Sequence, residues 1–108
     1  MIALPIAFKA LRMLIVTGAL TARPETLARL TAICLEHSKR SRAEQGCLHH
    51  NVFADCENSL RLFFYEEWTD EAALKTHFRV PESHAFMTEA RSLVTSAEGP
   101  CIFAGDKR

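Results

Sequence analysis

The sequence has no excess of charge of either sign. Thirteen Lys and Arg residues balance thirteen Asp and Glu residues, so the formal net charge over the 108 residues is zero. The two signs are interspersed, and no basic stripe is available to bind nucleic acid or an anionic membrane surface. We therefore expect neither nucleic acid nor a membrane as a partner.

Long apolar runs are also missing. The most apolar stretch, residues 1–20, is interrupted by Pro5, Lys9 and Arg12, and no basic segment precedes it. A membrane-spanning helix needs about 20 consecutive apolar residues, and a secretory signal begins with a basic segment. The sequence therefore predicts a cytoplasmic protein.

The cysteines lack the paired spacing that marks a zinc site or a redox motif. There are four of them, scattered along the chain: Cys34, Cys47, Cys56 and Cys101. In a cytoplasmic protein such residues are mostly small buried hydrophobes. We expect reduced thiols and no disulfide.

The chain length fits a single domain with one hydrophobic core. We assign this domain to residues 13–104, because Met13 opens the first regular apolar run. Residues 1–12 are interpreted as an N-terminal extension or a misplaced start, and residues 105–108 as a solvated tail.

Apolar periodicity and helix-end signals predict seven elements. Strands are predicted over residues 13–20, 47–53, 60–68 and 101–104, and helices over the stretches that begin at Pro24, at Thr69 as N-cap, and at Pro81. The resulting order, β-α-β-β-α-α-β, is typical of an α+β fold. It fits a ferredoxin-like split βαβ arrangement with a four-stranded antiparallel sheet.

Three glycines carry local predictions. Gly18, inside the first strand, indicates a bulge or a close backbone approach. Gly46 is interpreted as the C-cap of the first helix. Gly99 and Pro100 predict a break before the last strand, with Ala97 still on the apolar stripe of the last helix.

The predicted hairpin, residues 47–53 and 60–68, has apolar side chains on both faces. A sheet that helices cover on one side shows polar residues on the other side unless something else covers it. The simplest cover is the sheet of an identical subunit, so we expect a homodimer.

Three motifs follow one another in a characteristic order. Residues 41–52 read S-R-A-E-Q-G-C-L-H-H-N-V, similar to S-R-x-E-P-G-C-L-x-Y. Residues 63–74 read F-F-Y-E-E-W-T-D-E-A-A-L, similar to F-x-x-Y-E-x-W-x-D-x-x-A-L, and His77 with Pro81 matches H-x-x-x-P-H-F. The chain thereby resembles the antibiotic-biosynthesis-monooxygenase (ABM) family, in its quinol-monooxygenase-like branch. Glu82 departs from the pattern, because it replaces the second His of the third motif.

This resemblance implies a dimeric α+β barrel, in which two subunits pack sheet against sheet and each holds an apolar pocket between its sheet and helices. It also implies oxygenation of a small hydroquinone or phenol by dioxygen, without a cofactor. Triplet dioxygen reacts slowly with singlet organic molecules, and deprotonation of the phenol makes electron transfer to dioxygen easier. The protein then needs a base, an apolar pocket and hydrogen bonds for developing charge.

Two residues are candidates for the catalytic base. His77 is the first choice, because its ordinary pKa is near neutral and the helical period places it on an inner face. Glu66 shares a strand face with Trp68, where burial raises the pKa of a carboxyl group. Both have structural alternatives: His77 as a core histidine bonded to a backbone carbonyl, and Glu66 as a paired carboxylate.

Four further residues are candidates for substrate binding. Tyr65 and Trp68 can stack on an aromatic ring, although aromatic residues on sheets also pack cores. His49 and Asn51 can donate hydrogen bonds to a quinol oxygen. Because His49 and His50 are adjacent on a strand and point to opposite faces, they cannot bind one ion together, and we expect no metal site.

Other functions of the same fold remain open. The haem-degrading branch has an Asn in its first strand and a Trp where His77 stands here, so the resemblance argues against haem. Isomerases of phosphorylated quorum-signal sugar derivatives share the fold and part of the motif layout, with a histidine near the position of His37. A non-catalytic dimeric module that binds a small molecule is the third possibility.

Overall fold

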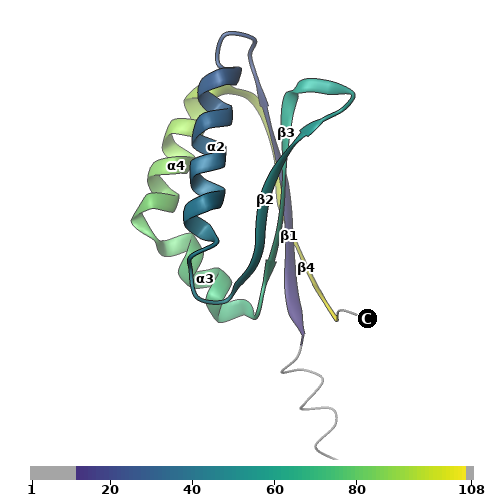
Figure 1. Cartoon of the computed structure of the whole chain (residues 1–108), viewed down its shortest axis with the longest axis vertical. Helices are drawn as coiled ribbons and strands as arrows, with labels where there is room; N and C mark the ends of the chain where they lie inside the picture. Colours follow the sequence, from purple (N-terminus) through teal and green to yellow (C-terminus); the bar gives the residue numbers. More distant parts are fainter. Residues whose placement is uncertain (1–11, 107–108) are drawn as a thin grey trace, which may run out of the picture.

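The computed structural model describes residues 12–106 and contains seven elements (Figure 1). The strands are β1 (Met13–Ala22), β2 (Cys47–Asp55), β3 (Asn58–Trp68) and β4 (Val94–Gly105), and the helices are α2 (Leu27–Ser41), α3 (Glu71–Arg79) and α4 (Pro81–Leu93). Their order confirms the predicted α+β, ferredoxin-like arrangement. The predicted N-terminal extension, apart from Arg12, lies outside the described residues.

The four strands form one antiparallel sheet in the order β2-β3-β1-β4. The two central strands, β3 and β1, are therefore hydrogen-bonded on both sides. All three helices cover the same face of this sheet (Figure 1). Side chains that point to this face are enclosed between sheet and helices, and those that point the other way are not.

Two apolar clusters fill the space between the helices and the sheet. The larger one joins β1, α2, β3 and α4 and contains Leu20, Ala22, Leu30, Ile33, Cys34, Leu62, Phe64 and Ala90. The smaller one lies beside α3 and contains Val16, Trp68 and Leu74. Burial of these side chains is the main favourable contribution to folding, because it removes apolar surface from water.

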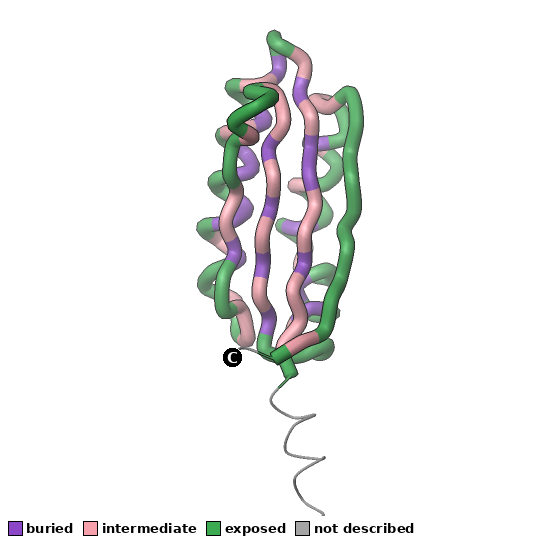
Figure 2. The backbone as a smooth tube through the Cα atoms, turned by 90° about the vertical axis from the view of Figure 1, so that its right-hand side faces the viewer, coloured by how far each residue is buried: buried purple, intermediate pink, exposed green. Residues whose placement is uncertain are grey.

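The opposite face of the sheet has no cover within the described chain (Figure 2). Along β3, residues 62, 64, 66 and 68 are buried, while the residues between them are only partly buried. Phe53 on β2 and Phe103 on β4 are 54% and 55% exposed. The alternation and the two apolar faces expected from the sequence are therefore both present.

Strand β4 differs from its prediction. It begins at Val94 and continues through Gly99 and Pro100 instead of starting at residue 101, and Ala97 belongs to it and not to a helix. The physical reason is pairing with β1, in which Ala97 lies opposite Leu20. Hydrogen bonds to a neighbouring strand keep this segment extended, and such partners cannot be read from local signals.

Gly18 confirms its prediction. The β1–β4 register shifts between Thr17 and Ala19, and a Cβ on Gly18 would lie 3.2 Å from the carbonyl oxygen of Glu98. The missing side chain thus lets two strands approach closely at an irregular point of the ladder. This point forms part of the wall of the cavity described below.

None of the helices in residues 12–106 is long and apolar enough to cross a membrane.

Gly46 serves the turn between α2 and β2, because α2 already ends at Ser41 and the glycine is therefore not its C-cap. Its φ is +86°, in the left-handed region that residues with a Cβ rarely adopt. A Cβ on Gly46 would overlap the Cβ of Ala73 and lie 2.8 Å from Thr69 Oγ1. This turn carries Glu44 toward the helix-covered side of the sheet.

Gly46→Ala is expected to lower the free energy of unfolding by about 2–4 kcal/mol, because it adds backbone strain and a collision with Ala73. Urea unfolding measures this change. Gly105→Ala is the control, since nothing lies within 4 Å of a Cβ there, and its effect should stay within about 0.5 kcal/mol. Equal stability of the two variants would contradict the role assigned to the turn.

Candidate functional site

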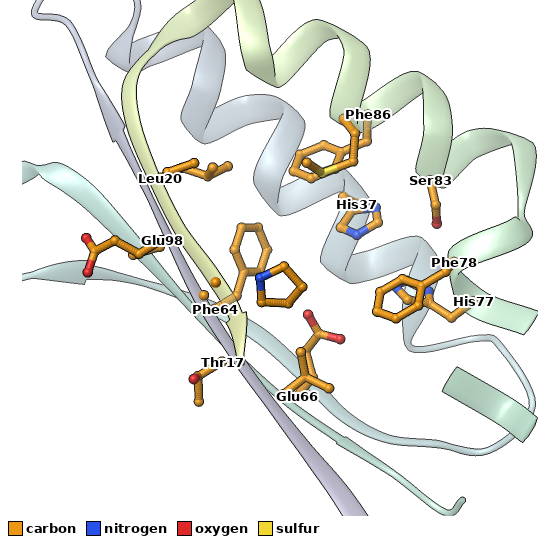
Figure 3. Close-up of a pocket in the computed structure, with 17 residues that line it drawn as sticks. Thr17, Leu20, His37, Phe64, Glu66, His77, Phe78, Ser83, Phe86 and Glu98 are labelled. Atoms are coloured by element: carbon orange, nitrogen blue, oxygen red, sulfur yellow. The ribbon is translucent and has the colours of Figure 1, made fainter. Parts of the chain in front are cut away.

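A cavity of about 280 Å³ lies between the three helices and the sheet (Figure 3). This volume is close to the lower end of the range for ligand pockets. Its wall is mostly apolar, and Phe64, Phe86 and Pro100 contribute to it. The polar side chains in the wall are Thr17, His37, Glu66, His77, Ser83 and Glu98.

Helix α3 places His77 in the cavity wall. The helix starts with Asp70 as N-cap, one residue after the predicted Thr69, and the Asp70 carboxylate accepts the backbone N–H of Ala73 at 2.8 Å. His77 is 3% exposed, and its Nδ1 lies 2.9 Å from Glu44 Oε1. Because a carboxylate only accepts, Nδ1 holds the proton and Nε2 of the neutral ring has a free lone pair. Burial lowers the pKa of His77, against the effect of Glu44, which raises it.

Arg40 connects His77 to a second histidine. Its Nη1 donates to Glu44 Oε2 at 3.0 Å, and its Nη2 donates to His37 Nδ1 at 2.7 Å. The His37 ring stacks on Phe86, with centroids 4.1 Å apart. Burial lowers the pKa of His37 to about 3, so this ring is neutral at physiological pH. An arginine cannot accept a proton, so Nδ1 accepts and Nε2 of His37 carries the hydrogen.

Strand β3 places Glu66 in the same wall. Its Oε1 accepts a hydrogen bond from Trp68 Nε1 at 2.9 Å, and burial raises the pKa of the carboxyl group to about 7. The acid and the carboxylate are therefore both populated near neutral pH. Trp68 is fully buried behind the wall, and the centroid of its ring is 4.5 Å from the centroid of the His77 ring. It is thus a support for two cavity residues and does not line the cavity itself.

His50 is a buried residue of this site that the sequence did not single out. It pairs with Glu66 in the β2–β3 register, and its Nδ1 lies 2.9 Å from Ser38 Oγ. Its Nε2 is 3.4 Å from Glu66 Oε2, but no hydrogen bond joins them, and this nitrogen has no hydrogen-bond partner among the described residues. Burial lowers the pKa of His50 to about 3. The available signal was that His50 shares a strand face with the apolar Val52, but strand alternation does not show which face the helices cover.

Three candidates for substrate binding lie on the opposite, helix-free face of the sheet. His49 has a side chain that is 53% exposed and lies 3.7 Å from Glu67. The Tyr65 hydroxyl donates to Glu67 at 2.6 Å, and the Asn51 side chain accepts from Arg42 at 3.3 Å. The cavity is therefore built without these three residues. Of the six candidates, the structure brings together His77, Glu66 and Trp68.

The arrangement of the histidines also differs from what adjacency along the chain suggested. His49 and His50 do point to opposite faces, but His50 meets His37 from α2 and His77 from α3. One ring nitrogen of each of these three buried histidines lies within 4.8 Å of the others. Three neutral imidazoles at such distances are a donor set that transition-metal ions prefer.

Comparison with known proteins decides the family. The family model described as "Antibiotic biosynthesis monooxygenase" (ABM) matches residues 13–89. The chain belongs to this family.

The chain is also similar to individual proteins. A candidate antibiotic biosynthesis monooxygenase from Deinococcus radiodurans has 26% identity and a TM-score of 0.78, covering 88% of this chain and 92% of the other. One from Nitrosomonas europaea has 11% identity and a TM-score of 0.81, covering 86% and 89%, which shows the fold alone. An uncharacterised protein from Synechocystis sp. is 27% identical over 81 residues, and the match spans 75% of this chain but only 55% of that relative.

The three ABM motifs meet at the cavity. Glu44 comes from the first motif, Glu66 and Trp68 come from the second, and His77 begins the third. The structure joins them through the bonds from His77 to Glu44 and from Trp68 to Glu66. The ABM segments therefore supply both the cavity wall and its support.

Two buried serines test the hydrogen bonds of this site. Ser38→Ala is expected to lower the free energy of unfolding by about 1–3 kcal/mol, because it leaves His50 Nδ1 buried without its partner. Ser83→Ala is the matched variant: its hydroxyl is buried, with no hydrogen-bond partner among the described residues. The free energy of unfolding of Ser83→Ala should be at most about 1 kcal/mol below the wild-type value, or higher than it. Denaturant titration compares them, and a larger loss for Ser83→Ala would contradict the assigned bonds.

Proposed function

We propose that the protein is a monooxygenase that oxidises a small hydroquinone or phenol with dioxygen, without a cofactor. The observation that carries this proposal is buried His77 in the wall of an apolar cavity, hydrogen-bonded to the partly buried Glu44, with Glu66 in the same wall. A base held by a carboxylate beside an apolar space is what deprotonation of a phenol requires.

His77 is the proposed base. Glu44 accepts the Nδ1 hydrogen, so Nε2 is the atom that takes the phenolic proton. The Glu44 carboxylate then stabilises the positively charged ring, as a carboxylate does in other carboxylate–histidine pairs. Arg40 holds Glu44 in place through its own hydrogen bond. Glu66, with a pKa raised to about 7, is a second group able to exchange a proton with the substrate.

The cavity suits a small neutral aromatic molecule. Phe64 and Phe86 offer ring faces and edges for packing. The Ser83 hydroxyl has no partner among residues 12–106, so it is available for a substrate oxygen. The described cavity wall contains no Lys or Arg, whereas Glu66 and Glu98 belong to it. This lining favours a neutral phenol over the phosphorylated sugar derivative that an isomerase would bind.

The overall reaction needs no external reductant. The phenolate passes one electron to dioxygen, and the resulting radical pair recombines at a ring carbon as a hydroperoxide. Loss of water then leaves one oxygen atom on the ring, so that hydroquinone and dioxygen give hydroxyquinone and water. The ring gives up four electrons: two reduce the oxygen atom that leaves as water, and two reduce the oxygen atom that stays on the ring. The protein supplies the base and an apolar site in which electrostatic interactions are strong.

His77→Ala is expected to lower kcat/KM for dioxygen-dependent quinol oxidation by about 10²–10⁴, because it removes the base. Oxygen uptake with a panel of hydroquinones, corrected for autoxidation, measures this change. Lys75→Ala, on the exposed side of the same helix, should keep nearly the wild-type rate.

The outcomes of this assay separate the candidate functions. No enzyme-dependent uptake over the panel would contradict the monooxygenase. Tight binding of the same quinols without turnover would instead favour the binding module. Turnover of a phosphorylated sugar derivative without oxygen uptake would favour the isomerase.

We further propose that the helix-free face of the sheet pairs with that of a second copy. Phe53 and Phe103 leave large apolar surfaces exposed there. Such surfaces on a sheet face are typical of a protein interface.

Sedimentation at micromolar concentration is expected to give twice the mass of one chain. Phe53→Glu combined with Phe103→Glu should give a monomer, because it places charges in an apolar interface. Leu35→Glu is the control, since Leu35 is 55% exposed on α2 and not on the sheet. A wild-type monomer would contradict the interface.

A further inference from the structure

We propose that His37, His50 and His77 form a binding site for a divalent transition-metal ion such as Zn²⁺, with the Glu66 carboxylate beside it. One ring nitrogen of each histidine lies within 4.8 Å of the other two. The rings come from α2, β2 and α3, so only the folded chain brings them together. All three are buried, with exposed fractions of 8%, 0% and 3%.

In all three rings, Nδ1 is already in a hydrogen bond. Nδ1 of His37 is bonded to Arg40, Nδ1 of His50 to Ser38, and Nδ1 of His77 to Glu44. Each ring therefore has Nε2 left for a ligand. The clearest case is His50 Nε2, which is completely buried and has no hydrogen-bond partner among the described residues. A buried nitrogen of this kind costs free energy unless something binds it, and a metal ion would satisfy it.

The bonds at Nδ1 resemble the outer contacts of histidine metal sites. In such sites the second ring nitrogen donates to a carboxylate, a carbonyl or another oxygen, which fixes the ring and makes the ligating nitrogen more basic. Glu44 Oε1 plays this part for His77, and Ser38 Oγ can play it for His50. His37 is different, because Arg40 donates to its Nδ1. For His37 Nε2 to bind a metal ion, its hydrogen must move to Nδ1. Arg40 must therefore release Nδ1, while it keeps its hydrogen bond to Glu44.

The distances require a modest closure of the site. Zn–N bonds of about 2.0–2.1 Å place the nitrogens of a tetrahedral site about 3.4 Å apart. The ring nitrogens that lie within 4.8 Å of one another must therefore approach by at most about 1.4 Å. Glu66 Oε2 is already 3.4 Å from His50 Nε2, which places a carboxylate oxygen near the same point. The three imidazoles are the donors, Glu66 is the nearest carboxylate that could move in as a fourth, and the Glu66 and Glu44 carboxylates balance the charge of the ion.

The site has a consequence that rests on the proposed function. His77 Nε2 is the atom that takes the phenolic proton, and it cannot do so while it binds a metal. A bound ion is therefore expected to inhibit the monooxygenase reversibly. The protein would then have a metal-bound, inactive form and a metal-free, active form.

Titration of the chelator-treated protein with Co²⁺ tests the site directly. We expect one equivalent to bind, with the visible absorption of tetrahedral Co²⁺, and Zn²⁺ to displace it. Zn²⁺ should also raise the Tm, because it binds the folded protein. His50→Gln and His77→Gln should each weaken binding at least about ten-fold. Measuring both keeps the test valid if one variant fails to fold, as far-UV circular dichroism would show.

The chain offers matched controls. Its other two histidines, His49 and His84, are exposed, so the double variant His49→Ala/His84→Ala should bind Co²⁺ as wild type does. Arg40→Met should bind more tightly, because it frees His37 Nδ1 and removes a positive charge. The site would be refuted by the absence of one-to-one binding at millimolar Co²⁺. Absorption bands of cobalt–thiolate bonds, or binding that persists in both cluster variants, would refute it equally.

The same samples separate the site from the proposed function. Oxygen uptake that Zn²⁺ abolishes and a chelator restores supports both proposals. Uptake that a chelator abolishes and metal restores would overturn the base role of His77, while the metal site would stand. Metal binding without any quinol oxidation would support the site alone.

Discussion

Buried polar side chains need partners, and this requirement organises the helix-covered side of the protein. Three histidines and one glutamate are enclosed there: His37, His50, His77 and Glu66. Each of them has a specific hydrogen bond, and Arg40, Glu44, Ser38 and Trp68 supply these bonds. In an apolar surrounding such bonds decide which atom carries a proton and how each ring is oriented. For His37 and His77, the donor and acceptor nitrogens are therefore fixed before any ligand enters the neighbouring cavity.

Membership in the ABM family gives these groups a shared context, because the three motifs of the chain meet at one cavity. The motifs supply two kinds of residue. Some, such as His77 and Glu66, reach the cavity, and others, such as Glu44 and Trp68, hold them in position. Arg40 and Ser38 are outside the motif segments but complete the same network from α2.

Most of the fold could be predicted because its signals are local. The element order follows from apolar periods of two and 3.6 residues, and Gly18 and Pro81 mark a bulge and a helix start. The helix ends at Gly46 and Thr69 were misplaced by a few residues, and the larger error occurs where strand pairing overrides local signals. β4 continues through Gly99 and Pro100 because β1 provides hydrogen-bond partners for it. The candidate site was half predictable: His77, Glu66 and Trp68 meet, while His49, Asn51 and Tyr65 lie on the other face of the same hairpin.

The sequence by itself determined the family, the seven elements and the presence of a histidine and a glutamate suited to acid–base chemistry. Only the tertiary structure decided which face of the hairpin the helices cover, and hence that His50 is enclosed while His49 is exposed. It also brought His37 and His77 to His50 from separate helices. The physical reason is that strand alternation assigns residues to two faces but does not show which face the helices cover. Contacts between elements distant in sequence depend on how helices dock, and no local pattern records this.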